Sequence, residues 1–543
     1  MPTDPSPKPS LGRDVLSGFL VFLIALPLCL GIAMASGFPP VAGVLTAIVG
    51  GLLGPFLGSA RLTIKGPAAG LIVIALGAVT ELGQGDAALG YRRALAVGVI
   101  AAGIQVVFAL ARVAKLGLLA PPSVVHGMLA AIGVIIFAKQ AHVVMGVTPE
   151  SKTPLALLAE IPWSLVRDNP EVLAIGATSL AILFGWPALA RRVRALAKVP
   201  PQLVVLLVAV PMGLAFRMDT PHDYALFGHE YHLGPELLLT LPGNLLDAIA
   251  FPDFSVALSA TSLKYVVMFA LVGSLESILS TLAVDALDPE RRPSNLDRDL
   301  LMTGVGNLVA SAIGGLPMIS EIVRSKANID AGARSPWSNF FHGLFLLVFV
   351  ASVPGLLHYI PLAALAAMLV YTGTRLASPH EVLHAKHLGR DQLVLFLATT
   401  IVTLAVDLLV GIAVGVALKL VLHALRAGGF VALFRTRVAA ERRDETLFVQ
   451  VVGPATFLAV LKLRDALAPA QDPSAVDPAD LAKPSVHRVV LDLGEAPLVD
   501  HTFLERAHAM VAELPSATLE LRRQDHLAPV SAHPHAARRA VRT

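Results

Sequence analysis

Long apolar runs separated by short polar breaks fill the first 425 residues of the chain. Residues 15–60 contain no Asp, Glu, Lys or Arg, and the break Gly37-Phe38-Pro39-Pro40 divides this stretch into two. Because a helix needs about 20 apolar residues to cross the hydrocarbon core of a bilayer, such runs predict membrane-spanning helices. The pattern gives fourteen segments, near residues 15–36, 39–58, 66–80, 92–111, 119–138, 170–190, 200–217, 262–284, 300–313, 316–329, 338–357, 361–375, 391–406 and 408–425.

Two of the predicted helices are too short to cross a membrane. Residues 66–80 and 317–329 would span about 22 and about 20 Å at about 1.5 Å per residue, against a hydrocarbon core of about 30 Å. Each has a proline near its start, Pro67 or Pro317, and each follows irregular sequence that contains glycine. They are the third segments of the first seven and of the second seven. Short, interrupted segments at matching positions predict an inverted repeat with two opposed half-helices.

Positively charged residues gather in the loops after segments six, eight, twelve and fourteen. They are Arg191, Arg192, Arg194, Lys198, Arg291, Arg292, Arg298, Lys386, Arg390, Arg426, Arg435, Arg437, Arg442 and Arg443. The short loops after segments one, nine, eleven and thirteen carry neither Lys nor Arg. Because cytoplasmic loops are enriched in Lys and Arg, both termini are predicted to be cytoplasmic. Residues 1–13 are expected to form a disordered cytoplasmic lead, and the apolar run that follows is too long for a cleavable signal peptide.

The composition agrees with a membrane protein. Hydrophobic residues make up 55% of the 543 residues and charged residues 15%, well below the level of about a quarter that is typical of soluble domains. The net charge of +3 is small, so the basic loop residues indicate orientation in a membrane and not nucleic-acid binding. Cys29 is the only cysteine, which excludes an intrachain disulfide.

Glu276 is a charged residue in the middle of the eighth segment, within ALVGSLESILS, and Ser280 follows it one turn later. A carboxylate inside a membrane segment is costly and therefore needs a reason. It could bind a coupling cation or exchange a proton, or it could belong to a buried structural ion pair. The functional interpretation is favoured because Glu276 lies in the first element of the second half and would face the half-helices.

Lys65 and Arg324 lie at the two half-helices. Lys65 stands just before the first one, where it could extend to the membrane interface or attract an anion. The amino end of a helix offers an anion unpaired N–H groups and a favourable dipole. Arg324 lies in the second half-helix, three residues after Glu321, so it could attract the substrate or form a salt bridge with Glu321. The sequence leaves these alternatives open.

Other polar residues have simpler interpretations. His126 is predicted to be a hydrogen-bonded structural histidine, Asp407 a boundary residue, and Lys419 a residue at the cytoplasmic edge of the last span. The histidines near the C-terminus are expected in a solvated tail: His526, His533 and His535. No Walker loop, HExxH, CxxC or nucleophile elbow occurs in a supporting context, so no enzyme activity is predicted.

The pattern changes to that of a soluble α/β domain near the C-terminus. Residues 446–452 and 487–493 are predicted strands, and residues 456–467 and 502–514 are predicted amphipathic helices. A loop rich in Pro and Asp, residues 468–485, separates the two halves. The domain carries no catalytic constellation, which favours regulation or dimer contact.

Several stretches carry a family resemblance. They are ALPLCLGIAMASGFPPVAG (25–43), IKGPAAGLIVI (64–74), the segment of Glu276, and GGLPMISEIVRSKANIDAGARS (314–335). With these motifs the chain resembles bacterial members of the sulfate permease (SulP) family, relatives of the solute-carrier 26 anion transporters. In the last stretch the residues that such transporters commonly have are Gly314, Gly315, Pro317, Arg324, Ser325, Asn328, Ala331 and Gly332. The stretch VVLDLGEAPLVDHTFLE (489–505) resembles the core of a STAS domain.

The resemblance implies an all-α membrane domain of fourteen transmembrane segments in a seven-plus-seven inverted repeat. A transport domain over residues 14–430 would contain repeats at about 14–217 and 262–425. Residues 431–543 would form a cytoplasmic α/β STAS-like domain with a basic linker and tail. Segments one to four and eight to eleven would build a core subdomain that moves against a gate subdomain in the manner of an elevator.

The same resemblance implies an anion site between the amino ends of segments three and ten. The contacts implied by position are Gly66, Ala68, Ala69, Gly70, Ile319, Ser320 and Glu321, and the charged residues Lys65 and Arg324 at the two half-helices complete the set of candidate substrate contacts. The backbone N–H groups of the first half-helix would contact the anion directly, and Lys65 would raise the local positive potential. Glu276, with Ser280 beside it, would take the place of the carboxylate that is linked to Na⁺ or H⁺ coupling.

The chain departs from the family pattern at the second half-helix and in the STAS-like loop. Ser320 is followed by Glu321 and Ile322, where many relatives have small hydroxyl residues. Val323 replaces a serine that some animal members have. His501 stands where related regulatory domains carry a phosphorylatable serine.

These features together predict a secondary transporter of a small inorganic oxyanion in a bacterial cytoplasmic membrane. Lys65 before GPAAG, together with SEIVRS, resembles SulP members associated with carbonic anhydrases, so bicarbonate is the first choice, ahead of sulfate and a dicarboxylate. Na⁺ or H⁺ would be the coupling ion at Glu276, with no other cofactor. The expected partners are the anion, the lipid bilayer and a second copy of the chain in a homodimer. An uncoupled anion channel and a membrane anion sensor are the alternatives from other functional classes.

Overall fold

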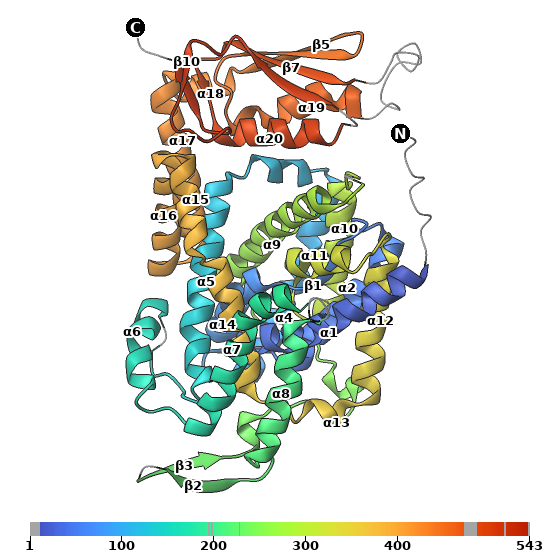
Figure 1. Ribbon diagram of the computed structural model, residues 1–543, viewed down its shortest axis with the longest axis vertical. Helices are drawn as coiled ribbons and strands as arrows, with labels where there is room; N and C mark the ends of the chain where they lie inside the picture. The colour runs from blue at the N-terminus through green and yellow to red at the C-terminus, as the bar shows by residue number, and fades with distance from the viewer. Residues whose placement is uncertain are drawn as a thin grey trace. The chain divides into compact units, whose positions relative to one another are not determined.

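The helices of the computed structural model follow the apolar segments of the sequence (Figure 1). The structure describes residues 11–540 except residues 152, 194, 195, 197, 198, 227, 291, 472–485, 515 and 516. Residues 1–10, the loop residues Arg194, Lys198 and Arg291, and most of the predicted Pro- and Asp-rich loop therefore lie outside the described residues. The chain divides into two compact units, which are described separately.

The first unit contains the described residues of Met1–Ala114, Ile132–Pro289 and Ser294–Ala377. Its helices are α1 Leu11–Ala35, α2 Pro40–Leu57, α3 Ile72–Gly83, α4 Ala87–Leu110, the later part of α5 Pro122–Val144, α6 Pro154–Ser164, α7 Pro170–Arg192, α8 Pro201–Ala215, α9 Ala260–Leu287, α10 Leu296–Ala312, α11 Ile322–Asp330, α12 Trp337–Ser352, α13 Pro354–Leu357 and α14 Leu362–Leu376. Its strands are β1 Ile64–Pro67, β2 His222–Leu226, β3 His229–Leu233 and β4 Met318–Glu321. The strands β2 and β3 form an antiparallel hairpin between the two halves of the chain.

A helix lies at each of the fourteen segments predicted from hydropathy. Among the described residues, seven helices are long and apolar enough to cross a membrane by themselves. The number of segments that cross the bilayer stays a prediction. The predicted disordered lead is wrong for residues 11–13, because α1 already begins at Leu11. The Asp14 carboxylate fixes this first turn by accepting hydrogen bonds from the backbone N–H groups of Arg334 and Ser335, at 2.9 and 3.2 Å.

The two half-helices are short, as predicted, but each is preceded by an extended strand that the sequence did not reveal. The strands β1 and β4 pair antiparallel, with Lys65 opposite Ser320 and Gly66 opposite Ile319. The predicted helix starts at residues 66 and 317 are therefore wrong, since α3 begins at Ile72 after a 3-10 turn, Ala69–Leu71, and α11 begins at Ile322. The pairing satisfies backbone groups that would otherwise be buried without partners.

Helix packing in the first unit is symmetric when the two halves are exchanged. Helix α1 packs on α12, and its counterpart α9 packs on α4. Likewise α2 packs on α12 as α10 packs on α4, and α1 contacts α11 as α9 contacts α3. Figure 1 shows α9, α10 and α11 gathered around β1 and α2. This exchange symmetry is what an inverted repeat produces, and it places the β1–β4 ribbon at its centre.

The second unit contains the described residues of Lys115–Ala131, Glu290–Pro293 and Ser378–Thr543. Its helices are the first part of α5, α15 Pro379–Leu388, α16 Arg390–Ala405, α17 Leu408–Ala427, α18 Phe430–Phe434, α19 Val460–Gln471 and α20 His501–Ala512. Its strands are β5 Arg437–Arg443, β6 Thr446–Val452, β7 Arg488–Glu495, β8 Leu498–Val499, β9 Thr518–Arg522, β10 Leu527–Pro529 and β11 Arg538–Ala540. Asp407 is the boundary residue before α17, and its carboxylate accepts a hydrogen bond from Val410 N at 2.8 Å.

The C-terminal part of the second unit is an α/β fold. Four strands form one sheet in the order β5-β6-β7-β9, in which β6, β7 and β9 run parallel. The helices α19 and α20 lie along this sheet in Figure 1. The sequence did not predict β5, because its charged stretch AERR hides the alternation. The expectation of a solvated histidine tail is wrong for His535, which packs on His508 with ring centroids 4.4 Å apart, because β11 joins a small sheet with β8 and β10.

A buried ion pair connects α17 to the start of α20. Lys419 Nζ lies 3.0 Å from Asp500 Oδ2, and neither side chain is exposed. Lys419 also donates to Thr502 Oγ1 at 2.6 Å, and His423 Nε2 lies 3.5 Å from Asp500 Oδ1. Burial alone would raise the pKa of the Asp500 carboxyl, but Lys419 and His423 outweigh it and hold this pKa well below its usual range. The lysine predicted at the cytoplasmic edge of the last span thus has a structural partner.

Replacing Asp500 by Asn is expected to lower the free energy of unfolding by about 3–5 kcal/mol, because Lys419 is left buried without its anion. The depressed pKa of Asp500 makes this stabilisation complete above about pH 4 and lost progressively below it. Chemical unfolding of the full chain in detergent, followed between neutral and acid pH, measures both effects. Asp492→Asn, at a partly exposed ion pair with Arg523, serves as the control and should cost at most about 1 kcal/mol. Equal stability of the two variants would contradict the stabilising role of the buried Lys419–Asp500 ion pair.

Candidate functional site

The β1–β4 ribbon presents two faces with different chemistry. Residues that lie opposite each other in an antiparallel pair share a face, and successive residues of a strand alternate between the faces. Lys65 and Ser320 therefore lie on one face, and Gly66 and Ile319 lie on the other. All four residues are buried.

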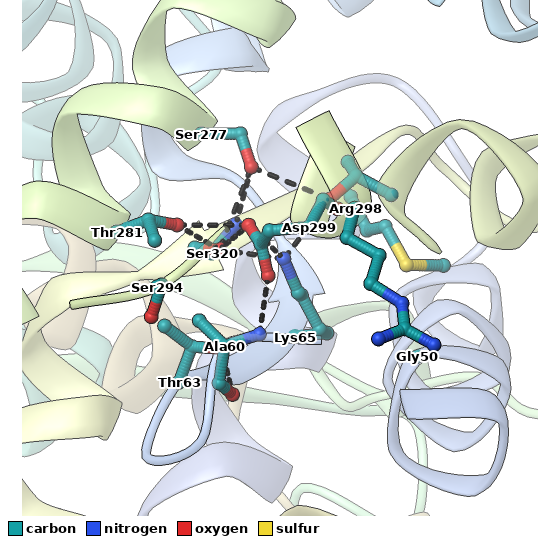
Figure 2. A network of polar contacts seen from close by, with 12 residues as sticks. Gly50, Ala60, Thr63, Lys65, Ser277, Thr281, Ser294, Arg298, Asp299 and Ser320 are labelled. Atoms are coloured by element: carbon teal, nitrogen blue, oxygen red, sulfur yellow. Dashed lines mark hydrogen bonds and ion pairs between the residues drawn. The ribbon is translucent and has the colours of Figure 1, made fainter. Parts of the chain in front are cut away.

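Lys65 is the centre of a buried polar network on the first face (Figure 2). Its Nζ donates to Asp299 Oδ2 at 2.8 Å, to Thr303 Oγ1 at 2.9 Å and to Ser320 Oγ at 2.6 Å. The Lys65 side chain is 0% exposed and that of Asp299 is 3% exposed. The three donor positions of the ammonium group are thus matched by three oxygen atoms.

Asp299 extends this network to neighbouring elements. Its carboxylate also accepts from Ala60 N at 2.7 Å and from Thr281 Oγ1 at 2.8 Å. Ser320 joins through Thr281 Oγ1, at 3.0 Å. The network therefore ties the ribbon to α9 and α10. A contribution of Lys65 and Ser320 to anion binding stays a prediction, and the structure gives both side chains partners within the protein.

Arg324 lies against the second face of the ribbon, in the first turn of α11. Its guanidinium group reaches Cys29 Sγ at 3.4 Å and Pro67 O at 3.4 Å. The side chain is 1% exposed, and within the described part of the chain its Nε has no hydrogen-bond acceptor. A Cβ atom on Gly66 would overlap the guanidinium group, so glycine is needed there for the close approach. Arg324 is thus a buried cation with an unused donor.

Glu276 lies against the amino end of the first half-helix. Its carboxylate contacts the backbone at Gly70 so closely that a Cβ atom there would overlap both oxygens. In the residues that the structure covers, Oε2 is buried and has no hydrogen-bond partner. Ser280 follows one turn later and is buried at 3% exposure. Both residues of the predicted coupling pair lie on α9, and their role stays a prediction.

Glu321 lies at the junction of β4 and α11. It is the N-cap residue of α11, but its side chain makes no capping hydrogen bond. Its carboxylate instead lies near the backbone amide of Ala69, at the start of the other half-helix, and near the charges of Arg324 and Glu276. Oε1 is buried and lacks a donor among the described atoms. The alternative of a direct Arg324–Glu321 salt bridge is not realised within the described residues, where the two side chains interact electrostatically at longer range.

The second face of the ribbon therefore gathers one cation and two carboxylates at two helix amino ends. The positive ends of the helix dipoles favour negative charge here, whether it comes from a side chain or from a bound anion. Of the predicted contacts, the structure brings together Gly66, Ala69, Gly70, Glu321 and Arg324. Ala68 and Ile319 are buried beside them, at 2% and 3% exposure.

Sequence reasoning missed four residues of this region. Asp299, Thr303 and Thr281 complete the Lys65 network, and His342 is fully buried near Arg324 with neither ring nitrogen hydrogen-bonded in the described structure. Asp299 stands near the start of its segment, where a charge is usually a boundary residue. The buried Lys65 is the signal that could have revealed it, because a lysine in a membrane segment requires an anionic partner.

Comparison with known proteins gives consistent matches. The protein-family model described as "Sulfate permease family" matches residues 11–399 of the chain. One relative is the "Putative sulfate transporter YvdB" of Bacillus subtilis, 27% identical over 84% of this chain and 82% of its own length. Another is the "Bicarbonate transporter BicA" of Picosynechococcus sp., 24% identical over 66% of this chain and 61% of its own length.

Solved structures share the architecture. The transmembrane domain of a cyanobacterial bicarbonate transporter BicA matches with a TM-score of 0.62 and 22% identity, over 75% of this chain and 97% of that chain. The murine Slc26a9 anion transporter in the inward-facing state matches with a TM-score of 0.65 and 15% identity, over 95% of this chain and 85% of that chain. At these identities the likeness shows the fold: a mostly helical transporter domain followed by a small α/β part.

Proposed function

The chain belongs to the sulfate permease family, and we propose that it is a secondary active transporter that prefers bicarbonate among the small inorganic oxyanions. Membership of this family makes it a membrane anion transporter and not an enzyme. The finer substrate assignment is supported by relatives named as bicarbonate transporters, while others are named as sulfate transporters. Sulfate and a dicarboxylate are therefore the competing substrates.

The observation that carries the proposal is the arrangement of Arg324 at two facing helix amino ends. A buried guanidinium group with an unused Nε donor is suited to an oxyanion, because its hydrogen bonds to an anion are charge-assisted. The absence of a side chain at Gly66 lets the guanidinium group lie directly against the backbone of β1, beside the amino end of the first half-helix. An anion in this position would touch both halves of the inverted repeat.

The proposed mechanism is an elevator in which the elements around the β1–β4 ribbon move as one body. The Lys65–Asp299 network supports such a rigid movement, because it joins β1 to α9 and α10 through side chains that are buried. The proposed setting is the cytoplasmic membrane of a bacterium, with a homodimer as the assembly, both termini in the cytoplasm and the α/β part as a regulatory STAS-like domain.

Uptake of labelled bicarbonate and labelled sulfate into proteoliposomes tests the function. The measurement is made with and without an inward Na⁺ gradient and an inward H⁺ gradient, and protein-free liposomes correct for CO₂ that crosses the bilayer. Saturable bicarbonate uptake that one gradient accelerates supports the proposal. Flux that only follows the anion's own gradient would indicate a channel, and anion binding without flux would indicate a sensor.

Glu276→Gln is expected to remove the acceleration by the ion gradient and to leave downhill exchange of the anion in place. The reason is that the amide can neither take up a proton nor neutralise a bound cation, although it keeps the size of the side chain. Initial uptake rates with and without the gradient give the result. Glu81→Gln, at the partly exposed Glu81–Lys264 ion pair, is the control and should couple like the wild type. Gradient-driven uptake that survives in Glu276→Gln would remove this carboxylate from the coupling step.

A further inference from the structure

Glu321 has one carboxylate oxygen without a donor in the candidate anion site, although its carboxylate accepts a backbone hydrogen bond from Ala69. Its Oε1 is buried and unpaired among the described residues, and the side chain does not cap its own helix. The hydrogen bond from Ala69, at the start of the other half-helix, accounts for one part of the carboxylate and leaves Oε1 without a structural role. A buried acceptor that stays unpaired is costly, which indicates that a bound ligand supplies the missing donor.

Arg324 provides the complementary half of the site. It lies three residues after Glu321, in the first turn of α11, and its buried Nε is a donor without an acceptor in the described structure. A ligand that satisfies both residues must accept a hydrogen bond from Arg324 and donate one to Glu321, and in a family of anion transporters such a ligand is an oxyanion. The two side chains together thus specify an anion with a hydroxyl group.

Small oxyanions differ in this property. Bicarbonate is a planar monoanion with oxygen acceptors and one O–H donor. Nitrate has the same planar shape and the same charge but no donor, and sulfate at neutral pH is a dianion without a donor. On the basis of the proposed function, we propose that Glu321 is the specificity-determining residue that accepts the bicarbonate O–H and rejects oxyanions without a hydroxyl group.

Charge adds to this discrimination. Glu276 places a second carboxylate with an unpaired oxygen at the same helix end, and it interacts electrostatically with Glu321. Each carboxylate repels a dianion twice as strongly as a monoanion at the same distance. An unpaired acceptor and a like charge both oppose sulfate, whereas nitrate is opposed by the missing donor alone. Nitrate and sulfate therefore separate the two contributions.

Competition for labelled bicarbonate tests this role, with unlabelled nitrate or sulfate as the competitor. Equilibrium binding of the same three anions to purified full-length protein gives a second readout that needs no flux. In Glu321→Gln the preference for bicarbonate over nitrate is expected to fall by about 10- to 100-fold, since the hydrogen bond from the bicarbonate O–H is no longer charge-assisted and the new amide N–H groups can donate to nitrate. The preference over sulfate should fall by more. Glu321→Asp should keep much of the selectivity, because it retains the carboxylate.

The control is Asp330→Asn, at the other end of α11, where an exposed Asp330 pairs with Lys326. Asp330→Asn should keep the wild-type preference for bicarbonate over nitrate and over sulfate. Wild-type ratios in folded Glu321→Gln would overturn the assignment, as would loss of all anion binding in Glu321→Gln and Glu321→Ala, which would make the carboxylate a required ligand. If the wild type neither binds nor moves bicarbonate, the proposed function fails separately. Acceptance of the bicarbonate O–H by Glu321 is then refuted as well. Only the rejection of sulfate by Glu321 would be left, and it requires that Glu321→Gln bind sulfate more tightly than the wild type.

Discussion

Arg324→Gln is expected to lower the affinity for the transported anion by about 100-fold or more and to reduce uptake close to that of empty liposomes. The guanidinium group is the cation that lies against the second face of the ribbon, and its loss removes charge-assisted hydrogen bonds worth about 1.5–3 kcal/mol each. Glu276 and Glu321 would then remain at the site without a compensating charge, so the local potential would repel an anion. Uptake of labelled bicarbonate over a range of concentrations measures the effect.

Two further variants separate charge from geometry at this position. Arg324→Lys keeps the charge but loses the planar fork of donors, so partial affinity is expected. Lys326→Gln, on the exposed side of the same helix, should behave like the wild type. The thermal unfolding midpoint of each purified variant shows whether the fold is retained. Wild-type affinity in a folded Arg324→Gln protein would mean that the anion binds elsewhere.

Lys65→Met is expected to destabilise the protein by about 3–5 kcal/mol, because Asp299 would be left buried without its cation. Asp299→Asn should cost a similar amount for the converse reason. The double variant should recover part of the loss, since neither side chain then carries an unpaired charge. Chemical unfolding of the four proteins in detergent gives the coupling energy between the two residues. Additive losses in the double variant would show that the ion pair is not the source of the stability.

The same variants address the predicted effect of Lys65 on the anion. If the ammonium raises the local positive potential, Lys65→Met should show a higher apparent KM for bicarbonate, and the double variant should return the KM toward the wild-type value because it removes one charge of each sign. An unchanged KM in folded Lys65→Met would assign Lys65 to the support of the ribbon alone. The ammonium group donates hydrogen bonds to Asp299, Thr303 and Ser320, so Lys65 is expected to stabilise the ribbon in either case.

The sequence was sufficient to predict the helical framework, because each segment has a simple physical cause. Apolar runs of membrane length gave the positions of the helices, and the shortness of the stretches at Pro67 and Pro317 gave the two half-helices. The strands β1 and β4 could not be predicted in this way. Their four residues each become strands only because the two segments meet in space and satisfy each other's backbone groups.

The candidate site was predictable only in part for a related reason. Glu276, Arg324 and Lys65 drew attention because charges are rare in apolar segments. Which of them face one another depends on strand alternation, which places Lys65 on one side of the ribbon and leaves Gly66 on the other, beside Arg324. The partner Asp299 lies 234 residues away in the chain, so its pairing with Lys65 is a property of the fold.

The central claim is that the chain moves a small oxyanion through the site at Arg324, with bicarbonate preferred. It is tested most directly by uptake of labelled bicarbonate into proteoliposomes containing the wild type or Arg324→Gln, with increasing unlabelled bicarbonate or sulfate as competitor. The account predicts saturable uptake by the wild type, stronger competition by bicarbonate than by sulfate, and uptake by Arg324→Gln close to that of protein-free liposomes. Wild-type uptake no greater than that of protein-free liposomes, or undiminished uptake by Arg324→Gln, would contradict it.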